Sequence, residues 1–250
     1  MSMSSATCRV LPFAESDGPG NMAADQTLLE SAAEGVASLR FYGWTTPTLS
    51  LGYFQPARRR LSDPLLAHLP FVRRPTGGEA LVHDHELTYA LALPAGQPWQ
   101  RRGESWVQRM HGIIRAACEQ LGLALSLGVC EQEKRLGPFL CFLHHTPCDL
   151  LLGKHKVVGS AQRKSKGGLL QHGAILLAQS PFTPSLPGFR ELAEIDWPTS
   201  KAAARDAILM AFGREAGWDL DATNWTDVER QRIGELAPGK YSSPTWNEKR

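Results

Sequence analysis

Cys141 is the residue of this 250-residue sequence whose type and surroundings best suit nucleophilic chemistry. It stands in FLCFLHH, between large apolar residues and next to His144 and His145. The same setting is typical of a buried, inert thiol, which is the usual fate of a free cysteine. Attack on a thioester requires a thiolate, whose pKa falls well below about 8.5 only beside cations or backbone dipoles. A nucleophilic Cys141 therefore requires a lysine or histidine close to it in the fold.

A lysine-containing turn, GKHKVVGSAQ, offers a candidate cation. In it Lys156 is followed by two β-branched residues and then by the small residues Gly159, Ser160 and Ala161, which leave room beside the backbone. Lys156 could thus point into a cleft. Taken alone, a lysine in a hairpin is more often a solvated charge.

A glycine-rich loop, RRPTGGEALVHD, has the composition of a ligand-binding loop. Gly77 and Gly78 let the backbone turn tightly and approach a polar ligand, and Arg74, Thr76 and His83 flank them. An ordinary hairpin with glycines at positive φ also explains this spacing.

A fourth segment, GLLQHGAILL, places His172 and Gly173 before an alternating strand, where both could face a cleft at the sheet edge. A single histidine at a strand start is more often structural. Because a glycine turn, a lysine turn and a His-Gly strand follow one another in this chain together with Cys141, we predict that the four segments form one site.

The elements that position these residues follow from the hydrophobic pattern. NMAADQTLLESAAEGVASLR predicts a helix whose apolar face contains Met22, Leu29, Ala33 and Val36, with its start marked by Gly-Pro-Gly. ESWVQRMHGIIRAACEQLG predicts a second helix that packs on the sheet and stops at Gly122. SKAAARDAILMAFGREAG and TDVERQRIGELA predict helices near the C-terminus, the last opening with a capping box of Thr226 and Glu229.

Strands fill most of the rest. LRFYGWTTPTLSLGYF predicts two strands around a Thr-Thr-Pro turn, and residues 71–94 predict strand, glycine turn and strands. The alternation in residues 87–93 suits a sheet buried on one face and partly covered on the other. The order of elements predicts a mixed α/β (α+β) fold with a largely antiparallel sheet flanked by helices. We expect a catalytic domain over residues 1–190, and a C-terminal helical segment over residues 191–250 packed on the same domain.

Composition excludes several classes of protein. A net charge of +2 is too mild to indicate nucleic-acid binding, and we interpret the run Arg58-Arg59-Arg60 as a solvated surface. Five cysteines without metal-type spacing fit neither a disulfide framework nor a zinc site, so we expect reduced thiols. No stretch of about 18 apolar residues and no signal sequence occurs, so we expect a cytoplasmic protein without a membrane anchor.

Together the segments resemble the biotin and lipoate protein ligase superfamily, specifically its lipoate-attachment branch of octanoyltransferases and lipoate-protein ligases. NMAADQTLLE resembles the opening helix of that family, and RRPTGGEALVHDHELTY resembles its substrate loop. GKHKVVGSAQRKSKGGLLQHGAILL resembles its lysine and His-Gly motifs, and KYSSPTWNEKR resembles a C-terminal signature. The resemblance covers nearly the whole chain.

Within the branch, the sequence is most similar to octanoyltransferases whose nucleophilic cysteine precedes the lysine motif in a Cys-Phe pair, here Cys141-Phe142. Cys148, which is not in such a pair, is the alternative nucleophile. ATP-using lipoate ligases usually have a third glycine where this chain has Glu79, and a Gly-Asn pair where it has Glu86-Leu87. These departures favour acyl transfer, with an ATP-dependent lipoate-protein ligase and a non-catalytic lipoyl-domain binder as the alternatives.

The resemblance implies that Cys141 attacks an octanoyl thioester on acyl carrier protein, and that a lysine of a lipoyl domain then aminolyses the acyl-enzyme. The acceptors would be the glycine cleavage H protein or the E2 subunit of 2-oxoacid dehydrogenases. Lys156 would hold the acyl carbonyl. We expect a monomer that uses no metal and no cofactor. The implied pocket residues are Arg74, Thr76, Gly77, Gly78 and His83, with Ser160, Ala161, His172 and Gly173 opposite.

Overall fold

The computed structural model of the chain describes residues 6–96, 98–100, 102–103, 105–128, 134–135, 139–165, 167–193 and 201–250. The α-helices are α1 (Gly18–Ala33), α2 (Pro64–Ala67), α3 (Trp106–Gln120), α4 (Phe189–Leu192), α5 (Lys201–Ala216), α6 (Asp227–Leu236) and α7 (Pro244–Asn247). Shorter helical turns are η1 (Ala57–Ser62), η2 (Cys141–Leu143) and η3 (Ala237–Tyr241). The strands are β1 (Thr7–Val10), β2 (Ala14–Ser16), β3 (Ser38–Trp44), β4 (Thr48–Leu51), β5 (Phe71–Arg73), β6 (Leu81–His83), β7 (Glu86–Pro94), β8 (Ser126–Leu127), β9 (Lys134–Arg135), β10 (His144–His145), β11 (Leu150–Leu152), β12 (His155–Ser165), β13 (Gly168–Leu176) and β14 (Asp219–Ala222).

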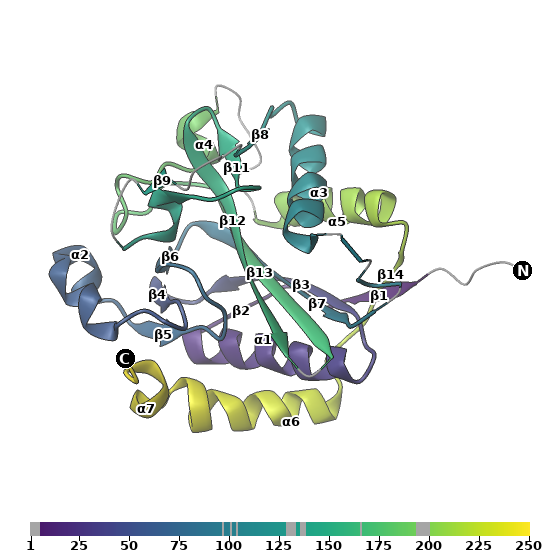
Figure 1. The fold of residues 1–250 in the computed structure, drawn as a ribbon, viewed down its shortest axis with the longest axis horizontal. Coiled ribbons are helices and arrows are strands. Elements are labelled where there is room, and N and C mark those ends of the chain that lie inside the picture. The colour runs from purple at the N-terminus through teal and green to yellow at the C-terminus, as the bar shows by residue number, and fades with distance from the viewer. Residues whose placement is uncertain are drawn as a thin grey trace, which may run out of the picture.

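The main sheet runs in the order β14-β1-β3-β7-β13-β12-β11-β8, and β2 pairs with β3 beside this path. The pairs β1–β14, β1–β3 and β2–β3 are parallel, whereas each pair from β3 to β8 is antiparallel. A mixed, largely antiparallel sheet flanked by helices is thus confirmed, as Figure 1 shows.

Both faces of this sheet are covered. Helices α3 and α5 pack on one face, and α1 packs on the other with α6 outside it (Figure 1). In β7, Leu87 and Tyr89 belong to the core under α3, while Ala90 and Ala92 belong to the core under α1. The prediction that one face of this strand is only partly covered is therefore wrong, because small alanine side chains let α1 approach the sheet closely.

The predicted first helix is α1, with different ends. It begins within Gly-Pro-Gly, where the side chain of Asp17 caps it by accepting a hydrogen bond from the Gly20 amide at 2.8 Å. Met22 is buried as predicted. Ala33 and Val36 are exposed, so their assignment to the buried face is wrong. The helix ends at Ala33, and the following turn carries Val36 away from the core.

The other predicted helices are confirmed. In α3, Ser105 caps the first turn and the predicted face, including Trp106 and Met110, is buried. The capping box of α6 is present, since the Glu229 amide donates to Thr226 Oγ1 at 3.2 Å and the Thr226 amide donates to Glu229 Oε2 at 3.0 Å. The same C-terminal segment also supplies β14, a strand that the sequence analysis did not predict, and β14 pairs with β1.

A second sheet, in the order β5-β4-β6, stands beside the main one and carries the glycine-rich loop between β5 and β6. The C-terminal signature packs against it. The Arg73 amide donates to Asn247 Oδ1 at 2.7 Å, and Trp246 Nε1 donates to the Arg73 carbonyl at 2.8 Å. None of the helices in the described ranges is both long and apolar enough to cross a membrane.

Candidate active site

A cavity with a largely apolar wall lies where the small sheet, the η2 turn and strands β12 and β13 meet. Most of the predicted site residues line it. They are Arg74, Gly78, His83, Cys141, Ser160, Ala161, His172 and Gly173. The sequence analysis did not assign the other lining residues, which are Met22, Tyr42, Ser50, Leu81, Thr88, Phe142, Gly159 and Ala174.

The Lys156 side chain reaches Cys141, which lines this cavity, although Lys156 itself is not among the lining residues. Cys141 opens η2 and is partly exposed, and its amide donates to the Ala80 carbonyl at 2.7 Å, which fixes the turn on the glycine-rich loop. Lys156 Nζ lies 3.8 Å from Cys141 Sγ and 3.4 Å from the Cys141 carbonyl oxygen. The cation that a thiolate at Cys141 requires is therefore in place.

Asp149 holds this lysine in position. Lys156 Nζ lies 2.8 Å from Asp149 Oδ2, and the two side chains are only 2% and 4% exposed. The same oxygen accepts hydrogen bonds from the Thr146 amide at 2.7 Å and the Thr146 hydroxyl at 3.0 Å. The sequence analysis missed Asp149. A signal existed, because a lysine that enters a buried site needs a carboxylate and Asp149 is the acidic residue of the same hairpin.

Gly159 gives the lysine side chain its path. A Cβ atom at this position would lie 2.5 Å from Lys156 Cε and 3.0 Å from its Nζ. Lys156 therefore folds back over a residue that has no side chain, with Nζ 5.3 Å from the centre of the Phe142 ring. On the neighbouring strand β13, Gly173 pairs with Ser160. A Cβ atom added at Gly173 would lie 2.7 Å from the Gly159 carbonyl oxygen, so this position also has no room for a side chain.

Cys148, the alternative nucleophile, does not line this cavity. Its backbone has φ 74°, a left-handed conformation that is uncommon for a residue with a side chain. Its carbonyl oxygen accepts a hydrogen bond from Nδ1 of His111, a buried residue of α3. The geometry favours Cys141, and Cys148 forms part of the turn that presents Asp149.

His111 starts a chain of buried hydrogen bonds that the sequence analysis missed. Because Nδ1 donates to a carbonyl, Nε2 must accept, and the Ser160 hydroxyl donates to it at 2.6 Å. Ser160 Oγ in turn lies 2.6 Å from the Tyr89 hydroxyl, which accepts from Gln171 Nε2 at 2.8 Å. Burial lowers the pKa of His111, which agrees with a neutral ring. The network ties the predicted Ser160 to the Cys148 turn.

The glycine-rich loop closes around the buried guanidinium of Arg74. Its NH2 atom donates to the Gly77 carbonyl at 2.8 Å and to the Glu79 carbonyl at 2.6 Å. Burial lowers the pKa of Arg74, and the Cys141 and Glu79 charges oppose this shift. Gly78, at φ 90°, lines the cavity as predicted. Gly77 was also predicted to line the cavity, but it is not among the lining residues. Gly77 instead positions Arg74.

His172 belongs to a second buried polar cluster. Its Nδ1 lies 2.7 Å from Asp25 Oδ2, and its Nε2 lies 2.6 Å from Thr76 Oγ1. Thr76 therefore orients His172 and is not itself part of the cavity wall, contrary to the prediction. Arg40 also binds Asp25, through Oδ1 at 2.8 and 3.0 Å. Burial raises the pKa of Asp25, but Arg40 and His172 lower it by more.

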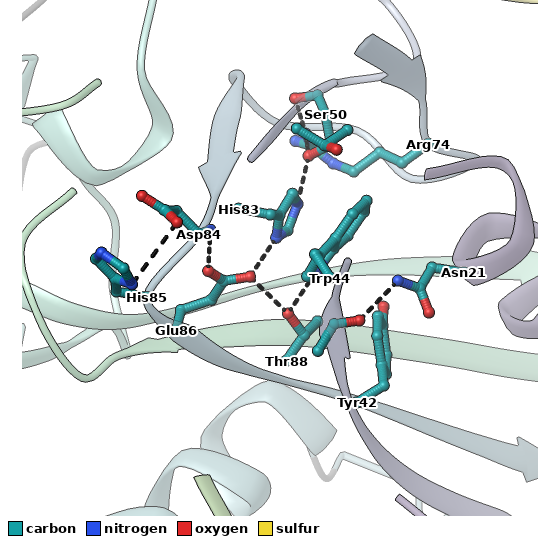
Figure 2. A network of polar contacts seen from close by, with 12 residues as sticks. Asn21, Tyr42, Trp44, Ser50, Arg74, His83, Asp84, His85, Glu86 and Thr88 are labelled. Carbon is teal, nitrogen blue, oxygen red and sulfur yellow. Dashed lines mark hydrogen bonds and ion pairs between the residues drawn. The ribbon is translucent and has the colours of Figure 1, made fainter. Parts of the chain in front are cut away.

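His83 forms part of the cavity wall with both ring nitrogens bonded (Figure 2). Nδ1 lies 2.8 Å from Glu86 Oε1, and Nε2 lies 2.9 Å from Ser50 Oγ. The ring stacks on Trp44 with centroids 3.8 Å apart. Burial lowers the pKa of His83, although Glu86 opposes the shift. Glu86 also accepts from the Thr88 hydroxyl, so one carboxylate orders two lining residues.

Comparison with known proteins identifies the family. A model of the lipoyl protein ligase A/B catalytic domain matches residues 17–191. The chain belongs to this family. Curated relatives named octanoyltransferase LipM include proteins from Lysinibacillus sphaericus, 37% identical over 92% of this chain and 94% of that protein, and from Bacillus subtilis, 30% identical over 99% and 100%.

Solved structures of the family share this fold. A bipartite lipoate protein ligase from Thermoplasma acidophilum superposes with a TM-score of 0.72 at 20% identity, covering 98% of this chain and 97% of that one. A lipoate-protein ligase A bound with ATP gives a TM-score of 0.76 at 21% identity, with 97% and 98% covered. The fold class expected from the resemblance is confirmed.

Proposed function

We propose that this protein transfers an octanoyl group from the thioester of an acyl carrier protein to a lysine of a lipoyl domain, through a thioester on Cys141. Octanoyl transfer is the activity named for relatives that are 30–37% identical over nearly the whole chain. The observation that supports the route through cysteine is the 3.8 Å separation of Lys156 Nζ and Cys141 Sγ at the cavity.

In the first step, the Cys141 thiolate attacks the carbonyl carbon of the donor thioester. Lys156, with its ammonium between Asp149 and the sulfur, stabilises negative charge on the thiolate and on the carbonyl oxygen of the tetrahedral intermediate. The bond to the carrier sulfur then breaks, and the released thiolate takes up a proton, which balances the proton that the Cys141 thiol lost. The apolar part of the cavity encloses the acyl chain, since each buried methylene contributes about 0.8 kcal/mol.

In the second step, the uncharged amine of the acceptor lysine attacks the same carbonyl carbon. The bond from the acyl carbon to Cys141 sulfur breaks as the amide bond forms, the attacking nitrogen gives one proton to solvent, and Cys141 is released as a thiolate. The reaction exchanges a thioester for an amide and therefore requires no nucleotide. The acceptors that fit this chemistry are lipoyl domains such as those of the glycine cleavage H protein and the E2 subunits of 2-oxoacid dehydrogenases.

Intact-protein mass spectrometry tests this proposal directly. The protein is mixed with octanoyl-acyl carrier protein in the absence of ATP, and we expect a gain of one octanoyl group that disappears after addition of a lipoyl domain. Cys141→Ala should abolish the adduct, whereas Cys148→Ala, the matched control, should retain it. Absence of an adduct on the wild-type protein, or an adduct lost only in Cys148→Ala, would contradict the proposal.

A further inference from the structure

A basic and apolar surface lies beside the loop that carries Cys141. We call it the basic rim and define it as Arg58, Arg59, Arg60, Lys249 and Arg250 together with Phe54 and Leu61. The Ala57 amide donates to the Arg250 carbonyl at 2.8 Å, which joins η1 to the C-terminal residues. In Figure 1, the C-terminus accordingly lies close to α2 and β5. Phe54 and Leu61 are 67% and 59% exposed.

The arginine run is therefore more than the solvated surface that the sequence suggested. Arg58 is exposed, but Arg59 and Arg60 are partly buried. The Arg60 guanidinium lies 4.4 Å from the centre of the Phe71 ring, and that of Arg59 lies 5.7 Å from the centre of the Phe139 ring. Aromatic contacts of this kind hold arginines in fixed positions without neutralising them.

Positive charge accumulates at this surface. Residues 54–63 and 246–250 contain five basic side chains and two acidic ones, in a chain whose net charge is only +2. No carboxylate in the described part of the chain forms an ion pair with Arg58, Lys249 or Arg250. The charge of Lys249 also affects Lys240. The pKa of Lys240 is lowered to about 8, mainly by burial and then by the positive charges of Arg163 and Lys249.

The segment that carries the basic rim is connected to the nucleophile through three residues, Gln55, Phe139 and Ala80. Gln55 Nε2 donates to the Phe139 carbonyl at 3.3 Å, and the Ala80 amide donates to the same oxygen at 3.0 Å. The Ala80 carbonyl then accepts from the Cys141 amide. None of the basic-rim residues lines the cavity, so a partner bound on the basic rim would stand beside the reactive loop and not on the cavity wall.

We propose that the basic rim docks the protein that donates the acyl thioester, by contact with acidic side chains around the attachment point of its prosthetic arm. This inference rests on the proposed transfer reaction. A thioester at the end of a long, phosphodiester-containing arm reaches Cys141 from a carrier bound to one side. An acceptor lysine is short, so its domain must sit directly over Cys141. The charge and the lateral position of the basic rim therefore fit the donor.

The test compares two donors that carry the same acyl group. Kinetics of Cys141 acylation are measured with octanoyl-acyl carrier protein and with octanoyl-pantetheine, which lacks the carrier, for wild type and the double variant Arg58→Glu/Arg250→Glu. We expect kcat/KM for the carrier to fall by about tenfold and to lose much of its salt dependence. With octanoyl-pantetheine, kcat/KM should change by less than about twofold. Arg102→Glu, an exposed arginine before α3, is the matched control and should resemble wild type.

Several results would overturn the inference. They are an unchanged kcat/KM with the carrier, an equal loss with both donors, or a defect that appears only when the lipoyl domain is varied, which would assign the surface to the acceptor. Failure of the wild-type protein to be acylated by either donor would instead refute the proposed function itself. Equal melting temperatures of the variants show that each remains folded.

Discussion

Two buried carboxylates, Asp149 and Asp25, hold cations close to the same cavity, beside the lining residues Cys141 and His172. Asp25 is fully buried, and its two oxygens contact Arg40, Tyr42 and His172. Asp149 contacts Lys156 and Thr146 through Oδ2. The Lys156 ammonium beside Asp149 also contacts the thiol of Cys141. Of the groups at Asp25, His172 contacts Thr76 and Arg40 donates to the Asn21 carbonyl, and none of these bonds reaches a nucleophile.

The difference separates a reactive site from a scaffold. A cation that also reaches a thiol can stabilise charge that appears during reaction. A carboxylate whose partners are all engaged fixes side chains and contributes mainly to the geometry of the wall. We therefore expect both sides to contribute to stability, but only the Asp149 side to control acylation of Cys141.

The largest effect should come from Lys156→Met. Loss of the ammonium removes the only described cation in hydrogen-bond contact with Cys141 Sγ, and we expect the rate of acylation to fall by about 10²–10³-fold. Single-turnover mass spectrometry of the octanoyl adduct measures this rate. Lys154→Met, which changes an exposed lysine of the same turn, is the control and should acylate normally. If Lys156→Met acylated within a few-fold of the wild-type rate, the Lys156–Asp149 pair would not be responsible for the reactivity of Cys141.

Asp149→Asn and Asp25→Asn test the comparison itself. Each leaves a buried cation without its carboxylate, so each should lower the free energy of unfolding by about 3 kcal/mol, measured by urea denaturation. The rate of Cys141 acylation should differ between the two variants. We expect Asp149→Asn to slow acylation of Cys141 by about tenfold, while Asp25→Asn stays within about threefold at saturating donor. Similar rates for the two variants would show that the two sides are not functionally distinct.

His111→Phe should have a smaller effect that refines the comparison. The variant leaves the Ser160 hydroxyl and the Cys148 carbonyl without their partner. Loss of these two hydrogen bonds, with Ser160 keeping its bond to the Tyr89 hydroxyl, should lower the free energy of unfolding by about 2 kcal/mol. Because Cys148 precedes Asp149, acylation should also slow, and His111→Gln should restore part of both properties. Full acylation by His111→Phe would mean that the turn does not need this histidine.

The smallest effect is a pH dependence that lies outside the site. Burial raises the pKa of Glu229, but hydrogen bonds from Arg9, Thr226 and Ser31 lower it to about 2, from an ordinary 4.5. The stabilisation is complete above about pH 4.5 and is lost as the pH falls toward 2. Since solvent screens the Arg9 contact, we expect the loss to be about 1 kcal/mol. Urea denaturation at pH 6 and pH 3 measures it, and Glu229→Gln should show a smaller decrease.

Local sequence rules determined many of the elements. The spacing of Trp106 and Met110 fixed α3, the capping box fixed the start of α6, and glycine turns marked the strands around the site. These features depend on residues within one or two turns of each other, so they can be read from a single sequence. The glycine-rich loop, Cys141, Lys156 and the His-Gly pair were identified in the same way, with the family resemblance joining them.

Only the tertiary structure decided which of these groups touch. His111 and Asp25 were not predicted because their partners lie on other strands or helices, and no local pattern encodes such contacts. The same reason explains why β14, a short polar strand, was missed, since its pairing with β1 spans most of the chain. Asp149 differs, because it belongs to the same hairpin as Lys156 and only its contact with the buried ammonium required the tertiary structure. Chemical type is a property of the residue, whereas proximity of Lys156 to Cys141 depends on how strands and loops pack, which long-range burial determines.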